Sequence, residues 1–272
     1  MALPFKPLAS LAPQFTMARC TPADVPQLWD IYSAAFLGTR FCYFWPASRA
    51  AMARWSDLRF RKRFQDPTDH EFKVVDGETG QIAGFVRWLV PEAMGPVMEE
   101  GFRTFSEAES GLAEGVDVPD MAEGAPAHAW TNFFEPIKAS GVKWDSAHKL
   151  SQSNPAFSKS KVSTWELFFL YGIRADWKSI VLDLTLLCVH PSYQGRGLSN
   201  ALLKPMLDLA DQLGVTAYLE ALENATPVYE KLGFRRVDEI VYDESKTGHE
   251  GVRRIDVMLR EPMQHLASQV VG

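Results

Sequence analysis

Residues 186–203 read L-L-C-V-H-P-S-Y-Q-G-R-G-L-S-N-A-L-L, and this stretch decides the fold. It continues an apolar run that starts at Val181 and is typical of a central strand buried on both faces. A loop with two glycines follows, and then apolar residues such as Leu202 and Met206 recur at helical spacing. A second apolar strand comes next, V-T-A-Y-L-E-A-L at 215–222. The unit is therefore predicted to be strand, glycine loop, helix and strand.

The glycine loop has the composition of an anion site. Gly195 and Gly197 let the backbone turn tightly, with no Cβ in the way of a ligand. The backbone amides from Gln194 to Ser199 are then expected at the start of a helix, where about half a positive charge resides. Arg196 could add a further cation. Such a site suits a pyrophosphate.

The residues before this unit predict a strand from Phe15 to Ala18, an amphipathic helix capped by Thr21, and a β-hairpin over 70–90 with D-G-E-T-G as its turn. Residues 91–160 form an insertion, in which Ser106 to Pro126 is acidic and contains Gly and Pro. We expect that stretch to be an exposed or poorly ordered loop.

The phrase at 186–203 resembles motif A of the GNAT superfamily of acetyl-CoA-dependent N-acetyltransferases, and A-T-P-V-Y-E-K-L-G-F at 225–234 resembles the motif that follows it. The resemblance implies an α/β (α+β) fold with a mixed, strongly twisted central sheet that splays at the fourth strand, flanked by helices. We expect one such domain over 1–272, in which the insertion forms or covers the acceptor site. Coenzyme A would lie in the split.

The resemblance also implies the residues that contact acetyl-CoA, which would be a co-substrate. Many members have an Asn seven residues before the Tyr of the second motif, whereas Asn224 lies five before Tyr229. The expected contacts come from the splayed strand, the glycine loop and this asparagine: Cys188, Val189, Gln194, Gly195, Arg196, Gly197, Leu198, Ser199 and Asn224.

Three residues are catalytic candidates. The resemblance implies that Tyr229 protonates the departing thiolate, which a phenol with a pKa near ~10 can do at neutral pH. Core packing is the alternative role for this ring. Glu220 and Asp183 lie on the strands that flank the predicted cleft, so either could take the proton of the acceptor ammonium. Glu166 or a water chain could serve as the base instead, and the carboxylates could have a purely structural role.

The predicted reaction is acetyl transfer from acetyl-CoA to a primary amine by direct attack in a ternary complex. An acyl-enzyme on Cys188 is disfavoured, because no His or acid is placed by sequence to activate that thiol. A small organic amine is the favoured acceptor, since the aromatic segments 41–45, 130–134 and 165–171 could line its pocket. A protein Lys or N-terminus is the alternative.

Two rival functions belong to other classes. A dinucleotide-binding oxidoreductase would also show strand, G-x-G, helix and strand, with Glu220 at a distance suited to a ribose. Against it, Asn200 replaces the third glycine, and five residues, His190 to Gln194, separate the strand from the first glycine. The second rival is a non-catalytic module that binds coenzyme A.

Composition limits the partners. The 272 residues carry 28 Lys+Arg and 34 Asp+Glu, a net charge of −6, which argues against a nucleic-acid binder. No apolar run reaches the ~20 residues that span a bilayer, and the six histidines lack metal-ligand spacing. We therefore expect a soluble cytoplasmic protein without a metal. The most basic segment, R-W-S-D-L-R-F-R-K-R-F at 54–64, has either a solvated face or one that binds an anion or a partner.

Overall fold

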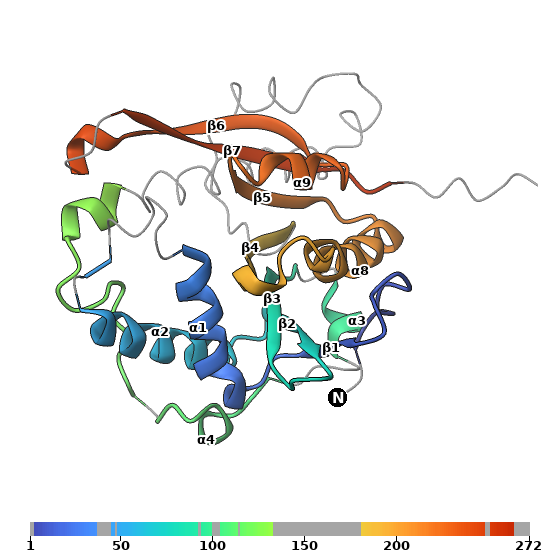
Figure 1. Ribbon diagram of the computed structural model, residues 1–272, viewed down its shortest axis with the longest axis horizontal. Coiled ribbons are helices and arrows are strands. Elements are labelled where there is room, and N and C mark those ends of the chain that lie inside the picture. Colours follow the sequence, from blue (N-terminus) through green and yellow to red (C-terminus); the bar gives the residue numbers. More distant parts are fainter. Residues whose placement is uncertain are drawn as a thin grey trace, which may run out of the picture.

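A seven-stranded mixed sheet forms the centre of the computed structural model, which describes residues 3–36, 45–46, 48–91, 94–99, 104–113, 115–132, 181–247 and 251–263. Its strands are β1 (Phe15–Arg19), β2 (Asp69–Asp76), β3 (Ile82–Leu89), β4 (Leu182–Val189), β5 (Ala217–Leu222), β6 (Arg235–Asp243) and β7 (Val252–Arg260). Their spatial order is β1-β2-β3-β4-β5-β7-β6 (Figure 1). Among these described strands β4 and β5 are parallel, and every other neighbouring pair is antiparallel.

Three long helices are described, α1 (Val25–Phe36), α2 (Arg49–Arg63) and α8 (Leu198–Leu213). The short helices are α3 (Gly95–Glu99), α4 (Glu107–Ser110) and α9 (Thr226–Glu230), together with the 3₁₀ turns η1 (Pro22–Asp24), η5 (Pro191–Tyr193) and η6 (Glu244–Thr247). Helix α8 ends at Gly214, whose φ of 69° is the left-handed conformation that a glycine adopts most readily. No helix of the described residues is long and apolar enough to cross a membrane.

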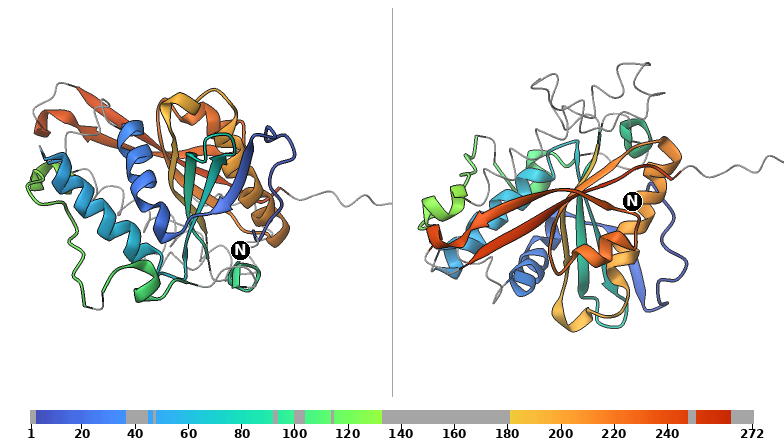
Figure 2. Two further views of the ribbon diagram at one scale, coloured as in Figure 1. Left: turned by 60° about the horizontal axis from the view of Figure 1, so that its bottom comes forward. Right: turned by 90° about the horizontal axis from the view of Figure 1, so that it is seen from above.

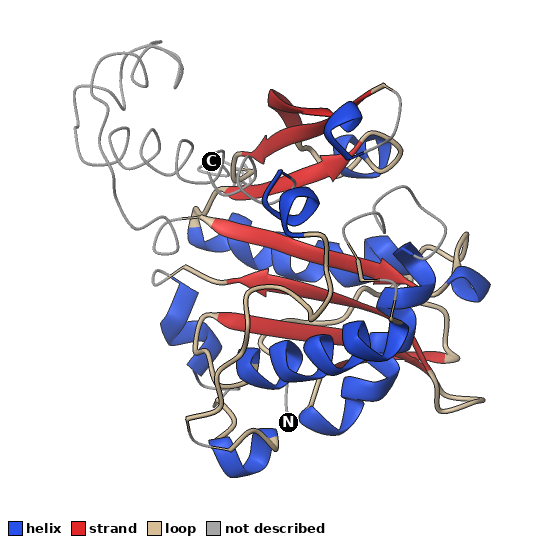
Figure 3. Cartoon of the chain, turned by 90° about the vertical axis from the view of Figure 1, so that its left-hand side faces the viewer, coloured by secondary structure: helices blue, strands red, loops and turns tan. Residues whose placement is uncertain are grey.

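The helices cover both faces of the sheet. Helices α1 and α2 lie on one face and α8 on the other (Figure 2), and the strands lie between helices in Figure 3 as well. Residues of α8 such as Leu202 and Met206 pack with Trp88 of β3 and Leu184 of β4. Strand β3 is buried along almost its whole length. The buried central strand predicted at 181–189 is confirmed for the first half of β4, Leu182 to Leu184, whereas Thr185 is exposed and most of the second half is only partly buried.

The hairpin predicted over 70–90 is confirmed as β2 and β3, which pair from Asp69↔Leu89 onward. The strand predicted from Phe15 is β1. The capping prediction is also confirmed, because Oδ2 of Asp24 accepts the backbone N–H of Thr21 at 2.7 Å. The first strand, the first helix and the hairpin therefore follow from local sequence.

The prediction of an exposed loop over 106–126 is wrong for part of that stretch. Helix α4 begins there, capped by the Ser106 hydroxyl, which accepts the N–H of Glu109 at 3.3 Å. Three described residues of the stretch are buried: Ser110, Leu112 and Ala122. Arg61 of α2 donates to the carbonyl oxygen of Ser110 at 2.9 Å. Hydrogen bonds from α2 thus order part of a segment whose composition alone predicts a disordered loop.

Candidate active site

The cleft of this protein lies where β4 and β5 part. The two strands pair in register only from Leu182↔Ala217 to Leu184↔Leu219, whereas β4 continues to pair with β3 as far as Val189. A cavity of about 620 Å³ occupies the opening. The remainder of β4, residues 184–189, lines it together with the glycine loop and α9. The splay expected at the fourth strand is confirmed.

The glycine loop forms one wall of the cavity through Gln194, Gly195, Gly197, Leu198 and Ser199. Gly195 and Gly197 have φ values of 77° and 76°, and Gly197 is the N-cap of α8. A Cβ at either glycine would meet no atom within 4 Å. The free amides at the start of α8 therefore border open space, which is the arrangement that suits an anion.

A neighbouring aromatic residue fixes the loop. The Tyr193 hydroxyl donates to Oδ2 of Asp76 at 2.9 Å, which ties η5 to the end of β2. The guanidinium of Arg196 lies over the Tyr193 ring at 5.1 Å and donates to the carbonyl oxygen of Ser192 at 3.3 Å. Arg196 does not line the cavity, so its side chain supports the loop rather than adding a cation to the cleft in this structure.

Tyr229 lies on α9 and lines the cavity with 8% of its surface exposed. Burial raises the pKa of its phenol well above the usual range, and the nearby Cys188 acts in the same direction. The hydroxyl is therefore protonated at neutral pH and available as a proton donor. The ring also packs edge-on against Phe234 at 6.0 Å between centroids, so the packing role considered from sequence is present as well.

Glu220 lies on β5 and lines the same cavity. Burial raises the pKa of this carboxyl to about 7, and a hydrogen bond from the Tyr218 hydroxyl at 2.5 Å acts in the opposite direction. A carboxyl with this pKa is partly ionised at neutral pH and can both accept and release a proton. Of the two strand carboxylates that the sequence singled out, this one faces the cleft.

Asp183 does not line the cavity. It lies where β4 is still paired on both sides, opposite Leu89 of β3 and Tyr218 of β5, and it is 4% exposed. Glu166 falls outside the described residues. The structure thus places Glu220 in the cavity and Asp183 outside it.

The cofactor residues expected from sequence lie together, except Arg196. Cys188, Val189 and Asn224 line the cavity with the glycine loop. Burial raises the pKa of the Cys188 thiol, which keeps it in its unreactive protonated form. His190 caps η5, with its Nδ1 2.7 Å from the Ser192 hydroxyl. The described residues contain no cluster of His, Cys, Asp or Glu able to hold a metal ion.

Two of the aromatic segments also contribute. Trp45 lines the large cavity, and Trp130 lines a second cavity of about 230 Å³ that shares Tyr32, Thr185 and Leu186 with the first. The other aromatic side chains of these segments, within 41–44, 133–134 and 165–171, lie outside the described residues. Tyr32 and the three arginines of the second cavity were not predicted from sequence as site residues, although 54–64 is the most basic segment of the chain.

Comparison with known proteins identifies this arrangement. Residues 173–247 match the family model of the acetyltransferase (GNAT) domain, and this range contains β4, the glycine loop, α8, β5 and α9. The part of the chain that forms the cleft therefore matches a GNAT acetyltransferase domain. The match includes the splayed strands and Tyr229, so the GNAT motifs coincide with the cleft.

A curated relative is described as an N-acetyltransferase as well. The chain is 34% identical over 83 residues to an uncharacterised N-acetyltransferase of Schizosaccharomyces pombe. The aligned region is 30% of this chain and about a third (35%) of that relative's length.

Solved structures share the GNAT fold at low identity. The structure of histone acetyltransferase HPA2 and related acetyltransferase from Corynebacterium glutamicum gives a TM-score of 0.50 at 17% identity, over 93% of this chain and 99% of that one. A mosquito arylalkylamine N-acetyltransferase like 5b gives 0.50 at 12% identity, over 91% and 99%. These two likenesses concern the fold.

Proposed function

We propose that this protein is an acetyl-CoA-dependent N-acetyltransferase that acetylates the primary amine of a small molecule by direct attack in a ternary complex. The observation that carries the proposal is the 620 Å³ cavity between β4 and β5, which brings the glycine loop, Glu220 and Tyr229 together. An anion-binding loop, a base with a pKa near 7 and a protonated phenol are the three groups that this transfer needs.

When bound, acetyl-CoA supplies an activated acetyl thioester. The amides from Gln194 to Ser199 bind its pyrophosphate, and the backbone of β4 near Cys188 and Val189 binds the pantetheine and the thioester carbonyl oxygen. Glu220 takes the proton that the acceptor ammonium loses. Tyr229 gives its proton to the leaving sulfur. The protons therefore enter and leave through two separate side chains of the same cavity.

Three observations weigh against the rivals. A ping-pong route through Cys188 lacks a thiolate, because burial raises the pKa of that thiol. A coenzyme A-binding module without activity would not need both Glu220 and Tyr229 in the lining of the cavity. A dinucleotide-binding fold would continue the parallel sheet beyond β5, whereas β5 pairs antiparallel with β7. An acceptor on a protein stays the alternative within the enzyme class.

The test is turnover of acetyl-CoA against a panel of amines that includes basic peptides, followed by thiol release. The proposal expects acetyl-CoA, and not NAD(P)H, to raise the melting temperature, and it expects thiol release to depend on a small amine. Stabilisation by acetyl-CoA without turnover of any amine would favour the binding module. Turnover of the peptides alone would move the acceptor to a protein.

A further inference from the structure

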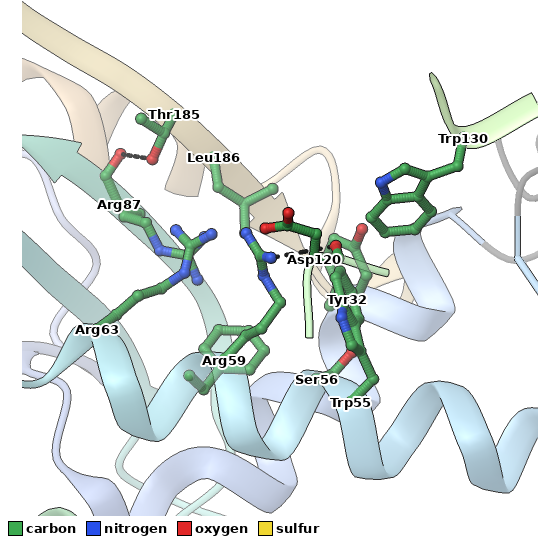
Figure 4. A pocket seen from close by; sticks show the side chains of 11 residues that line it. Tyr32, Trp55, Ser56, Arg59, Arg63, Arg87, Asp120, Trp130, Thr185 and Leu186 are labelled. Atoms are coloured by element: carbon green, nitrogen blue, oxygen red, sulfur yellow. Dashed lines mark hydrogen bonds between the residues drawn. The ribbon is translucent and has the colours of Figure 1, made fainter. Parts of the chain in front are cut away.

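The second cavity, of about 230 Å³, is lined by three arginines and lies directly beside the cleft. Arg59 and Arg63 come from α2, and Arg87 comes from β3. Figure 4 shows the side chains of Arg59 and Arg63 rising from α2 toward β4, with Arg87 beside Arg63. We call this cavity, defined by these three residues, the arginine chamber. The basic run at 54–64 is thus not simply a solvated face.

Many donors of the arginine chamber are unused within the part of the chain that the structure describes. The hydrogen bond of Arg59 goes to the backbone oxygen of Asp120 at 3.3 Å, and its guanidinium lies over the Trp55 ring at 4.8 Å. Arg63 has one ion pair, at 3.5 Å to Asp69. A guanidinium carries five N–H donors. Both groups therefore retain donors for a ligand.

A buried hydroxyl points to the same conclusion. Ser56 lines the arginine chamber, is 2% exposed, and its Oγ has no hydrogen-bond partner among the described residues. A buried hydroxyl without a partner destabilises the fold, so such groups usually meet a ligand or water. A polar ligand in the chamber would satisfy it.

The carboxylates that pair with Arg63 and Arg87 do not line the chamber. Arg87 donates to Oε1 of Glu71 at 2.5 Å, and neither Glu71 nor Asp69 lines the chamber. Burial and the neighbouring Arg87 lower the pKa of Arg63 to about 10 and lower that of Arg59 too, since the positive charges oppose one another. Among the described residues that line the chamber, the acid is Asp120, which is exposed. A bound anion would relieve this repulsion.

The chamber also has an apolar wall. The rings of Trp55 and Trp130 meet edge-on with centroids 5.0 Å apart, and both line the chamber. Tyr32, Thr185 and Leu186 border both the chamber and the cleft that holds Glu220. The two cavities therefore adjoin at these three residues.

We propose that the acetyl acceptor is a small amine that also carries an anionic group, and that Arg59 and Arg63 bind this group in the arginine chamber. The inference rests on the proposed acetyltransferase function and names its acceptor class. The amine lies in the cleft near Glu220, the carbon chain passes Tyr32 and Thr185, and the anion accepts hydrogen bonds from the guanidinium groups. A carboxylate and a phosphate share this chemistry.

Matched acceptors test the proposal. A series of ω-amino carboxylates of increasing length is compared with the corresponding ω-amino amides, and ω-amino alkyl phosphates form a third arm. At the best length the anionic acceptor is expected to give a kcat/KM about tenfold or more above its amide, because charge-assisted hydrogen bonds contribute more than neutral ones. The carboxylate and phosphate arms decide which anion fits. Equal kcat/KM for acid and amide at every length overturns the proposal.

Substitutions in the arginine chamber, with a control on the same helix, provide a second test. Arg59→Gln should raise KM about tenfold or more for the anionic acceptor and leave the amide unchanged, whereas Arg59→Lys should retain part of the preference. Asp120→Asn removes the competing acid and should lower KM for the anionic acceptor. Arg54→Gln is the matched control, because Arg54 lies on the same helix in an exposed pair with Glu123 and should change nothing. An Arg59→Gln enzyme that keeps its acid-over-amide preference overturns the proposal.

The experiments distinguish a wrong acceptor class from a wrong acetyltransferase function. If the amides are acetylated as well as the acids, the function stands and the arginine chamber is not a binding site. The chamber is also tested without turnover, by the melting temperature in millimolar ω-amino carboxylate. A rise in the wild type that is lost in Arg59→Gln supports the anion site, and no rise in the wild type contradicts it.

Discussion

The Tyr218 hydroxyl donates a hydrogen bond to Oε1 of Glu220 at 2.5 Å, two residues along the same strand. Because side chains two apart lie on the same face of a strand, β5 itself sets this pair. The bond favours the carboxylate, while burial favours the carboxylic acid, and burial is the larger effect, which leaves the pKa near 7. A fully buried tyrosine thus adjusts the group that we assign as the general base.

The first prediction concerns pH. Glu220 accepts a proton only when ionised, so kcat/KM should rise with pH up to about 7, the pKa of this carboxyl, and then level off. Glu220→Gln should lower kcat/KM by roughly 10²–10⁴-fold and remove this acidic limb. Tyr218→Phe should move the limb to higher pH, because it removes the hydrogen bond that lowers the pKa. The measurement is kcat/KM from pH 5 to 9. An unchanged limb in Glu220→Gln would assign the base to another group.

The second prediction concerns the leaving group. Tyr229→Phe keeps the ring but removes the hydroxyl, so kcat should fall by roughly 10²–10⁴-fold, while acetyl-CoA affinity stays close to normal. The melting temperature should change little, because the packing against Phe234 remains. Rate, calorimetric affinity and melting temperature are measured on the same preparation.

Tyr229→Ala is the companion variant. It removes both the hydroxyl and the buried ring, so it should lose rate and also about 3–5 kcal/mol of stability, as large-to-small core substitutions do. If Tyr229→Phe retained half or more of the wild-type kcat when chemistry limits the rate, the ring would serve packing alone.

The third prediction concerns the glycine loop. Gly195→Glu places a carboxylate where the pyrophosphate is proposed to bind, so acetyl-CoA binding should be abolished. Gly115→Glu is the matched control. Gly115 has a φ of 73°, its Cβ would also meet no atom within 4 Å, and it does not line the cleft. Both variants carry the same backbone strain, so calorimetry should separate them. Equal affinity in the two would refute the phosphate site.

The fourth prediction concerns stability. Asp211 of α8 and Arg260 of β7 form a two-point ion pair, with both N–O distances 2.7 Å and each side chain 2% exposed. Asp211→Ala leaves the guanidinium buried and unpaired, so the free energy of unfolding should fall by about 3–5 kcal/mol. Asp208→Ala, which breaks the half-exposed pair with Lys204 on the same helix, should cost about 0.5 kcal/mol or less. Urea unfolding of both variants checks this; a similar cost for the two would contradict it.

The conformation of the glycine loop and the position of Tyr229 in the cleft could be predicted because their signals are local. Two glycines between an apolar strand and an amphipathic helix specify their own backbone, and the structure places both at positive φ beside the cleft. The choice between Glu220 and Asp183 needed the sheet register. Asp183 precedes the point where β4 leaves β5, and no pattern in the sequence marks that point.

The arginine chamber shows a different limit. Met52, Ser56 and Phe60 recur at helical spacing and are buried, so the inward face of α2 could have been traced from sequence. Arg59 and Arg63 lie along the border of that face. The side chain of an arginine at the edge of a buried helix face can point to solvent or to the interior, and the residues packed against the helix decide which. Here those residues are Arg87 of β3 and residues 120 and 130. Those contacts are distant in sequence.

The antiparallel ladder of β3 and β4 has a consequence for how such a protein can diversify. The ladder joins Leu89 to Asp183, and the chain between them leaves and rejoins the sheet at adjacent strands. Closing a flexible connection costs only about 0.6 kcal/mol more each time its length doubles. Evolution can therefore lengthen, shorten or replace this connection, part of which borders the arginine chamber, while the ladder and the glycine loop stay intact. In the function proposed above, the acceptor site and the transfer site therefore lie on parts of the chain that can change independently.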